Sequence, residues 1–123
     1  MDPRHALGAR AERHAARLLE ASGLRVVERN VRLTGGEIDL VCREHDTWVF
    51  VEVKARRPGW DDAPSAAVSW AKRRRLVRLA QRYLKWRGLR DVRCRFDVVE
   101  VSDDGLGTAT IRHLRSAFDA GPG

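Results

Sequence analysis

The chain has few cysteines and no long apolar segment, and both shortages narrow what it can be. Cys42 and Cys94 form no C-x-x-C pair and show no Cys/His spacing typical of zinc, so buried, reduced thiols are expected. The longest uncharged apolar run in the strand-like region is residues 48–51, far shorter than the roughly 20 residues that span a bilayer. Residues 1–5 lead into an amphipathic pattern rather than an apolar signal core. A cytoplasmic protein without a membrane partner is therefore expected.

Lysine is also scarce, with three residues among 24 basic ones, although the formal net charge is +7. An arginine bias partly follows genome composition, so the arginine count alone indicates little. The placement of the basic residues is more informative. Residues 70–95 hold eleven basic side chains and one acid, so the rest of the chain is on balance acidic. This local excess favours a polyanionic partner such as nucleic acid.

At 123 residues the chain has the length of one domain, with a core expected over about residues 6–114 and a tail over 115–123. Apolar residues at helical spacing predict two helices, over residues 6–21 and 69–87. Alternating segments predict five strands, over residues 24–30, 37–43, 47–54, 92–101 and 108–114. The order of these elements predicts an α/β fold, in which a mixed sheet of about five strands is flanked by the two helices.

The second and third predicted strands carry acidic side chains in a distinct pattern. Strand alternation places Glu37, Asp39 and Val41 on one face of the second strand. It likewise places Glu52 and Lys54 on one face of the third. The opposite face of this hairpin is then apolar.

The loop between these strands sets which residues lie opposite each other. If residues 45–46 form a two-residue loop, Asp39 faces Glu52, and Glu37 faces Lys54. His-Asp is not a favoured sequence for such a loop, and a loop one residue longer would shift every pair. Directly opposed Cβ atoms lie about 4.5–5.5 Å apart, and two carboxylates there repel each other unless a cation lies between them.

Two converging carboxylates beside a lysine are what phosphodiester cleavage with a divalent metal requires. Mg²⁺ prefers a few carboxylate oxygens together with waters and a phosphate oxygen. The metal activates a bound water, and the lysine orients that water or stabilises the charge that develops on phosphorus. The alternative is a solvated cross-strand ladder of salt bridges, which would leave net negative charge unpaired.

These motifs resemble those of the PD-(D/E)-x-K nuclease superfamily, which has the restriction-endonuclease-like fold. Asp39 is followed thirteen residues later by an acid-x-Lys element, Glu52-Val53-Lys54. The proline of the superfamily's name is replaced by Ile38. Four segments more specifically resemble the YraN family of small bacterial proteins, which is related by fold to archaeal Holliday junction resolvases. They are Ala11-Glu12, Gly36-Glu-Ile-Asp-Leu-Val41, Phe50-Val-Glu-Val-Lys54 and Arg95-Phe-Asp-Val-Val99.

The resemblance implies a metal site for Mg²⁺ or Mn²⁺ and a set of catalytic residues. Its catalytic residues would be Asp39, Glu52, Lys54 and Glu12, and its metal ligands Asp39, Glu52 and the carbonyl of Val53. Glu12 would support or complete the metal site, whereas without the resemblance it would be interpreted as a solvated helix residue. Glu37 would either support the metal ligands or pair with Lys54.

A basic stripe along the second predicted helix is the candidate surface for nucleic acid. Arg74, Arg78 and Arg82 recur at i, i+4 and i+8, the spacing of one helix face. The residues expected to contact phosphate are Arg56, Arg57, Lys72, Arg74, Arg75, Arg78 and Arg82. Such contacts provide affinity without reading sequence, and a solvated helix face is the alternative. Trp60 is the better candidate for stacking on bases, while Trp48 is expected in the core.

Together these features favour a Mg²⁺- or Mn²⁺-dependent endonuclease that acts on DNA, with branched or junction DNA as one candidate substrate. Paired cuts would need two sites, which a homodimer would supply. Two alternatives remain open, a nucleic-acid-binding protein of nuclease-like fold without catalysis and a protein-interaction factor in DNA maintenance. The residues do not distinguish DNA from RNA, or a junction from other substrate shapes.

Overall fold

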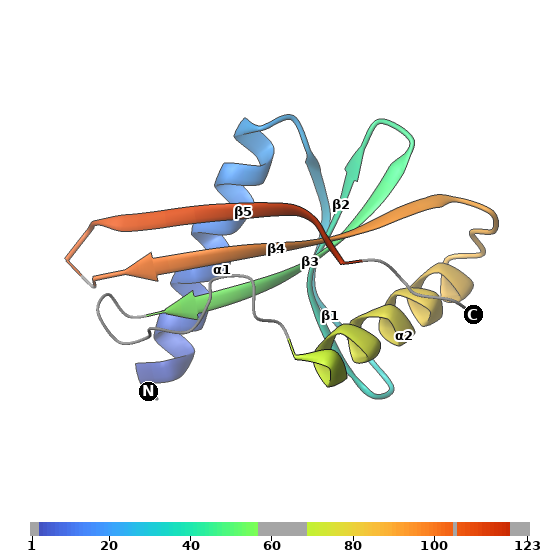
Figure 1. Ribbon diagram of the computed structural model, residues 1–123, viewed down its shortest axis with the longest axis horizontal. Helices are drawn as coiled ribbons and strands as arrows, with labels where there is room; N and C mark the ends of the chain where they lie inside the picture. The colour runs from blue at the N-terminus through green and yellow to red at the C-terminus, as the bar shows by residue number, and fades with distance from the viewer. Residues whose placement is uncertain (1–2, 57–68, 105, 119–123) are drawn as a thin grey trace.

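The computed structural model describes residues 3–56, 69–104 and 106–118. Its elements follow the predicted order of helix, three strands, helix and two strands (Figure 1). They are α1 (Pro3–Ala21), β1 (Arg25–Leu33), β2 (Gly36–Glu44), β3 (Thr47–Arg56), α2 (Trp70–Trp86), β4 (Arg93–Asp103) and β5 (Ala109–Phe118). The prediction of an α/β fold with a five-stranded mixed sheet and two flanking helices is confirmed.

The strands form one sheet in the spatial order β1-β2-β3-β4-β5. Only β3 and β4 are parallel neighbours, and the other three pairs are antiparallel. Parallel neighbours need a crossover connection, and the chain between β3 and β4 contains α2. The two helices cover opposite faces of the sheet (Figure 1), so the site strands β2 and β3 lie between two separate layers of side chains.

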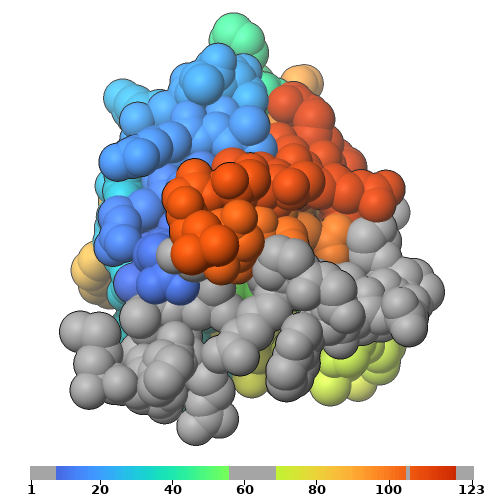
Figure 2. Space-filling view, turned by 90° about the vertical axis from the view of Figure 1, so that its left-hand side faces the viewer, coloured from blue at the N-terminus to red at the C-terminus, as the bar shows by residue number. Residues whose placement is uncertain are grey.

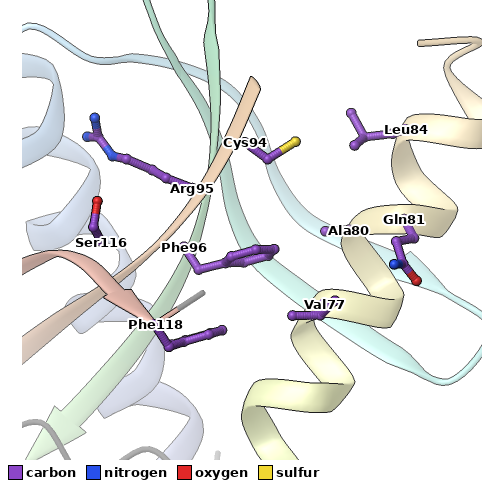
Figure 3. Close-up of a pocket in the computed structure, with 9 residues that line it drawn as sticks. All are labelled: Val77, Ala80, Gln81, Leu84, Cys94, Arg95, Phe96, Ser116 and Phe118. Atoms are coloured by element: carbon purple, nitrogen blue, oxygen red, sulfur yellow. The ribbon is translucent and has the colours of Figure 1, made fainter. Parts of the chain in front are cut away.

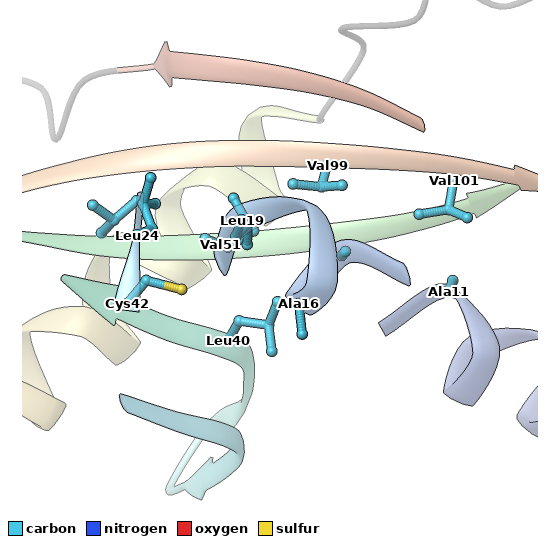
Figure 4. Close-up of a cluster of buried hydrophobic side chains, with 11 residues drawn as sticks. Ala11, Ala16, Leu19, Leu24, Leu40, Cys42, Val51, Val99 and Val101 are labelled. Carbon is cyan, nitrogen blue, oxygen red and sulfur yellow. The ribbon is translucent and has the colours of Figure 1, made fainter. Parts of the chain in front are cut away.

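α1 lies close to the sheet because its buried side chains are small. Ala11, Ala15 and Ala16 are at most 1% exposed and pack, together with Leu19, on side chains of three strands (Figure 4). These strand residues are Leu40, Cys42, Val49, Val51, Val99 and Val101. β5 also contributes to this layer and lies beside α1 in the view of Figure 2. The packing of these alanines fixes the position of the α1 backbone relative to the sheet.

The layer under α2 is largely aromatic. The fully buried Tyr83 ring makes edge contacts with Trp48 and Phe50, at centroid distances of 6.0 and 5.9 Å. The Tyr83 hydroxyl donates to Glu28 Oε1 over 2.8 Å, so the polar end of this side chain has a partner on β1. The expectation that Trp48 packs in the core is confirmed.

The ends of several elements have identifiable causes. Ser69 caps α2, and its hydroxyl accepts a hydrogen bond from the Lys72 N–H at 3.2 Å. β5 continues to Phe118, four residues beyond its predicted end, and so includes residues 115–118 that were expected in the tail. The Phe118 ring stacks on Phe96 of β4 with centroids 5.2 Å apart, which anchors this extension. Among the described residues, no helix has the length and apolar character needed to cross a bilayer.

The two cysteines differ, which corrects the expectation that both are buried. Cys42 lies in the α1 layer and is fully buried, whereas Cys94 is exposed. Cys94 stands near the start of β4, where the strand borders an open cavity of about 290 Å³ beside α2 (Figure 3). That cavity is lined by Val77, Ala80, Gln81, Leu84, Cys94, Arg95, Phe96, Ser116 and Phe118. None of the predicted catalytic, metal-binding or nucleic-acid-binding residues is among them.

Candidate functional site

The β2–β3 hairpin has the register that a two-residue loop predicts. Five pairs follow it, from Glu44 opposite Thr47 to Leu40 opposite Val51. His45 adopts a left-handed φ of +54°, which allows the tight turn despite its unfavoured sequence. The register expected from the loop is therefore confirmed.

The ladder between β2 and β3 ends one residue before the acids. Residues 36–38 pair only with β1, so Asp39 lies where β2 leaves β3 and is not paired with Glu52. The strands likewise do not bring Glu37 opposite Lys54. Instead, Asp39 Oδ2 accepts a hydrogen bond of 2.8 Å from the Val53 N–H. This bond closes the gap between the separating strands and fixes one oxygen of the carboxylate.

The expected alternation of faces fails in β2 at the same point. Ile38 and Val41 both pack in the layer under α2, whereas Leu40 and Cys42 pack in the layer under α1. Val41 therefore does not share a face with the acids, and the prediction of one apolar and one acidic hairpin face is wrong for this strand. The reason is an irregularity at Asp39, where β2 loses its pairing with β3 and where Asp39 and Asn30 of β1 do not form a regular pair.

Three carboxylates, one from α1 and two from β2, meet beside this point. Oxygens of Glu12, Glu37 and Asp39 all lie within 4.8 Å of one another, a separation that one metal ion can bridge. Glu12 comes from α1, next to the buried Ala11, and is half-buried. The structure thus brings the predicted Glu12 to Asp39 and adds Glu37 as a third potential ligand. We refer to Glu12, Glu37 and Asp39 as the acid cluster.

Asn30 is a site residue that the sequence analysis missed. It lies on β1 between the residues paired with Ile38 and Leu40, and its side chain hydrogen-bonds to the Glu12 carboxylate. Its φ is +52°, a conformation in which asparagine is enriched. An asparagine inside a predicted strand was the available signal, because such a residue often marks an irregular position.

The acid cluster holds an excess of negative charge, which is only partly offset by Arg32, whose Nε lies 3.8 Å from Glu37 Oε2. Burial, together with the charges of Glu52, Glu12 and Glu37, raises the pKa of Asp39 to about 7, although the hydrogen bond from the Val53 N–H acts in the opposite direction. Burial also raises the pKa of Glu12; the hydrogen bond from Asn30 lowers it, and the Glu37 charge raises it. Bringing several carboxylates together in a partly buried place favours either protonation or a bound cation.

Glu52 and Lys54 lie on β3 at positions that alternate with the residues packed under α1. Burial raises the pKa of Glu52, while Lys72, Arg75 and Lys54 act in the opposite direction. The predicted Lys72 and Arg75 are thereby placed near the acid-x-Lys element. Lys54 is also the neighbour of the buried Glu100 on β4, a second acid that the sequence analysis did not single out.

The basic residues of α2 do not all share one surface. Arg75, Arg78 and Arg82 line a cavity of about 200 Å³ together with Gly35 and Leu79. The exposed Arg74 does not line this cavity. The Arg56 side chain, Arg57 and Trp60 are outside the described residues.

Comparison with known families gives this arrangement a context. The profile of the family described as "Uncharacterised protein family UPF0102" matches residues 11–101, which include the acid cluster and the acid-x-Lys element. The chain belongs to the UPF0102 family. The resemblance to YraN proteins is confirmed at this level, and the assignment of the family to a nuclease superfamily stays a prediction.

Similar UPF0102 proteins come from diverse bacteria. The UPF0102 protein of Dechloromonas aromatica is 48% identical over 118 residues, covering 96% of this chain and 95% of its own. That of Beutenbergia cavernae is 47% identical over 115 residues, covering 94% and 98%. That of Symbiobacterium thermophilum is 46% identical over 114 residues, covering 93% and 97%. The likeness therefore extends over nearly the whole of each chain.

Proposed function

We propose that this UPF0102 protein is a Mg²⁺- or Mn²⁺-dependent endonuclease that cleaves phosphodiester bonds in DNA. The observation that carries the proposal is the acid cluster at the point where β2 leaves β3, with Glu52 of β3 close enough to raise the pKa of Asp39. Carboxylates from a helix and a strand are brought together there although they repel one another. A structural role would favour pairing each acid with a base instead.

The donor set fits a hard divalent cation. Glu12, Glu37, Asp39 and Glu52 offer carboxylate oxygens, which Mg²⁺ and Mn²⁺ prefer, and no sulfur or imidazole that would favour zinc. The N–H of Val53 points toward Asp39, and the N–H and C=O of one strand residue point toward the same neighbouring strand. The Val53 carbonyl is thus directed to the same side and would complete the set. Glu37, expected only to support the ligands, becomes a candidate ligand.

The remaining groups would position the substrate and manage charge. When bound, the ion would polarise a phosphate oxygen and lower the pKa of a coordinated water. Lys54 would orient the attacking water or stabilise charge developing on phosphorus. Asn30 would hold the Glu12 carboxylate in one orientation, and the Val53 N–H would do the same for Asp39.

A non-catalytic nucleic-acid-binding protein is the second candidate, because the arginine-lined cavity beside α2 could bind phosphate without any metal. In that case the acid cluster would hold only a structural ion. The two functions differ in whether bound DNA is cut.

The deciding experiment measures cleavage of labelled duplex, single-stranded and four-way-junction DNA with Mg²⁺, Mn²⁺ or EDTA. Wild type is compared with Glu52→Ala and Asp39→Asn, and Asp46→Asn in the exposed hairpin turn serves as a matched control. We expect metal-dependent cutting that is lost in the first two variants and kept in the control. Binding without cutting in all proteins would favour the second candidate. Undiminished cutting by Asp39→Asn and Glu52→Ala would overturn the proposed site.

A further inference from the structure

The arginine-lined cavity has its lining residues on α2 and on the turn that joins β1 to β2. Figure 1 shows this turn beside α2. Leu76, Leu79, Ala80 and Tyr83 define the buried side of α2, and the three arginines of the cavity lie along one flank of it. The guanidinium of one of them, Arg82, donates a hydrogen bond to a carbonyl of that turn. We refer to the cavity formed by Arg75, Arg78, Arg82 and Gly35 as the arginine cavity.

The charge of the arginine cavity is not balanced by direct ion pairs within the described residues, although Arg75 interacts with the charge of Glu52. Among residues 3–56, 69–104 and 106–118, no carboxylate forms an ion pair with Arg75, Arg78 or Arg82. Three guanidinium groups around one hollow repel one another, and an anion between them would relieve this repulsion. A guanidinium matches phosphate oxygens in geometry and is weakly hydrated, so phosphate is the anion that suits this lining best.

The turn is shaped to let the arginines converge. A Cβ added at Gly35 would lie 2.6 Å from Arg82 Nη1, and one at Gly36 would lie 3.3 Å from Leu79 Cδ1. Gly35 also has a φ of +100°, which side chains rarely adopt. The cavity of about 200 Å³ has room for several waters of about 30 Å³ each, and therefore for one phosphate group.

The arginine cavity is connected to the acid cluster by two structural links. Gly36 begins β2, and the next residue is Glu37 of the acid cluster. On the other side, Arg75 is close enough to affect the charge of Glu52. A strand whose reacting phosphate lies at the acids can therefore extend toward α2 and present a further phosphate to the arginines.

We infer that the arginine cavity binds a backbone phosphate of the nucleic acid, other than the one that is cleaved, and so positions the strand at the acid cluster. This inference rests on the proposed function for its substrate, but binding in the cavity needs no metal and no cleavage. It assigns separate roles to basic residues of one helix. Arg75, Arg78 and Arg82 contact a defined phosphate, whereas Arg74 contributes only general charge.

Two matched variants test this inference. Arg78→Ala and Arg74→Ala each remove one exposed arginine from α2, but only the first removes a side chain of the arginine cavity. Binding to a fluorescent DNA oligonucleotide is measured in EDTA across a range of salt concentrations. We expect Arg78→Ala to weaken binding about tenfold and to reduce the salt slope by about one, as the loss of one phosphate contact predicts. Arg74→Ala should change affinity less than about threefold.

Competition with inorganic phosphate tests whether the arginine cavity binds a backbone phosphate of DNA or a free phosphate ion. We expect it to compete with the oligonucleotide weakly, at millimolar concentrations, in wild type and less in Arg78→Ala. Equal effects of Arg74→Ala and Arg78→Ala would overturn the inference, because the charge would then act diffusely. Tight binding of free phosphate with unchanged DNA affinity in Arg78→Ala would also overturn it.

A further variant, Arg78→Lys, separates recognition by the guanidinium from charge alone. It keeps the charge but loses the forked donor geometry, so affinity should fall to a value between wild type and Arg78→Ala. Full retention of wild-type affinity would contradict a defined phosphate contact. A third outcome separates this inference from the proposed function. If no protein, wild type included, cleaves DNA with metal, but Arg78→Ala still binds DNA more weakly than Arg74→Ala, the nuclease is rejected and the phosphate site is retained.

Discussion

Two acids of the sheet, Asp97 and Asp39, have opposite surroundings. Asp97 of β4 is fully buried and accepts hydrogen bonds from Arg95 Nε at 3.0 Å and from the Ser116 N–H at 2.9 Å, while His113 Nε2 lies 2.7 Å away. Within the described part of the chain, the half-buried Asp39 has one such donor, the Val53 N–H, and lies beside other acids. The charge of Asp97 is balanced by groups of the chain itself. The excess of negative charge around Asp39 is left for a group that binds from outside.

The comparison shows why burial of an acid is by itself a poor sign of function. Both carboxylates are removed from water, and the sequence shows each beside apolar strand residues. What separates the two is the sign of the neighbouring charges, because Arg95 lies beside Asp97 whereas acids lie beside Asp39.

The largest effect should come from removing the satisfied acid. Asp97→Ala would leave Arg95 and its other donors without their buried acceptor, so the free energy of unfolding should fall by about 3–5 kcal/mol. Urea denaturation measures this change, with Asp46→Ala in the exposed turn as a control that should stay within about 0.5 kcal/mol of wild type. A loss below about 1 kcal/mol for Asp97→Ala would remove the contrast between the two groups.

Removing the charge of Asp39 should stabilise the metal-free protein, in contrast to the removal of Asp97. Asp39 has a folded pKa of about 7, above its ordinary 3.8, so the folded state binds the extra proton and loses stability as pH rises between these values. Asp39→Asn should therefore raise the free energy of unfolding by roughly 2–4 kcal/mol at pH 8 in EDTA and by little at pH 4. Urea titrations at both pH values test this. An equal change in the free energy of unfolding at both pH values would show that the charge of the Asp39 carboxylate does not destabilise the folded protein.

Metal binding should depend on Glu37 as well as on the acids expected from the sequence. Mn²⁺ titrated into wild type at pH 8 should raise the melting temperature, and less at pH 6, where the proton on Asp39 competes with the ion. Glu37→Gln should weaken Mn²⁺ affinity about tenfold or more, by the loss of one carboxylate ligand. Glu20→Gln on the exposed part of α1 is the matched control. Equal affinity in the two variants would exclude Glu37 as a ligand.

The smallest effect should come from an acid that is paired near the surface. Hydrogen bonds from Arg115 and Arg95 lower the pKa of Glu44 to about 2, below its ordinary 4.5. Its contribution to stability is thus full above pH 4.5 and is lost as pH falls toward 2. Because solvent screens the pair, Glu44→Gln should cost only about 0.2–1 kcal/mol at pH 7 and nothing at pH 2. A cost that persists at pH 2 would mean that Glu44 acts through packing rather than charge.

Much of the fold could be predicted because it depends on local patterns. Apolar spacing located both helices, and the loop at residues 45–46 fixed the register of β2 and β3. The alternation rule failed at Asp39, because it assumes that a strand keeps the same neighbours along its length. The exposure of Cys94 was missed for a related reason, since a strand segment at the edge of a layer is not covered from both sides.

The candidate site was only partly predictable. Asp39, Glu52 and Lys54 lie on consecutive strands, so their spacing along the chain already predicts that they lie near one another. The convergence of Glu12 with Glu37 depends on how α1 packs against the sheet, and no local pattern contains that distance. Which arginines of α2 line the arginine cavity depends in the same way on the position of the turn before Gly36.

The alanines of α1 have a consequence for how finely the site is adjusted. Ala11 and Ala15 have almost no side chain, and they flank Glu12 in the helix sequence. Their small side chains set how closely α1 packs on the sheet, and hence the distance between the Glu12 carboxylate and the acids of β2. Adding a methyl group or two there would widen the gap without touching any reactive atom. Under the proposed function, the size of ion that the acid cluster accepts would therefore depend on residues that have no reactive group of their own.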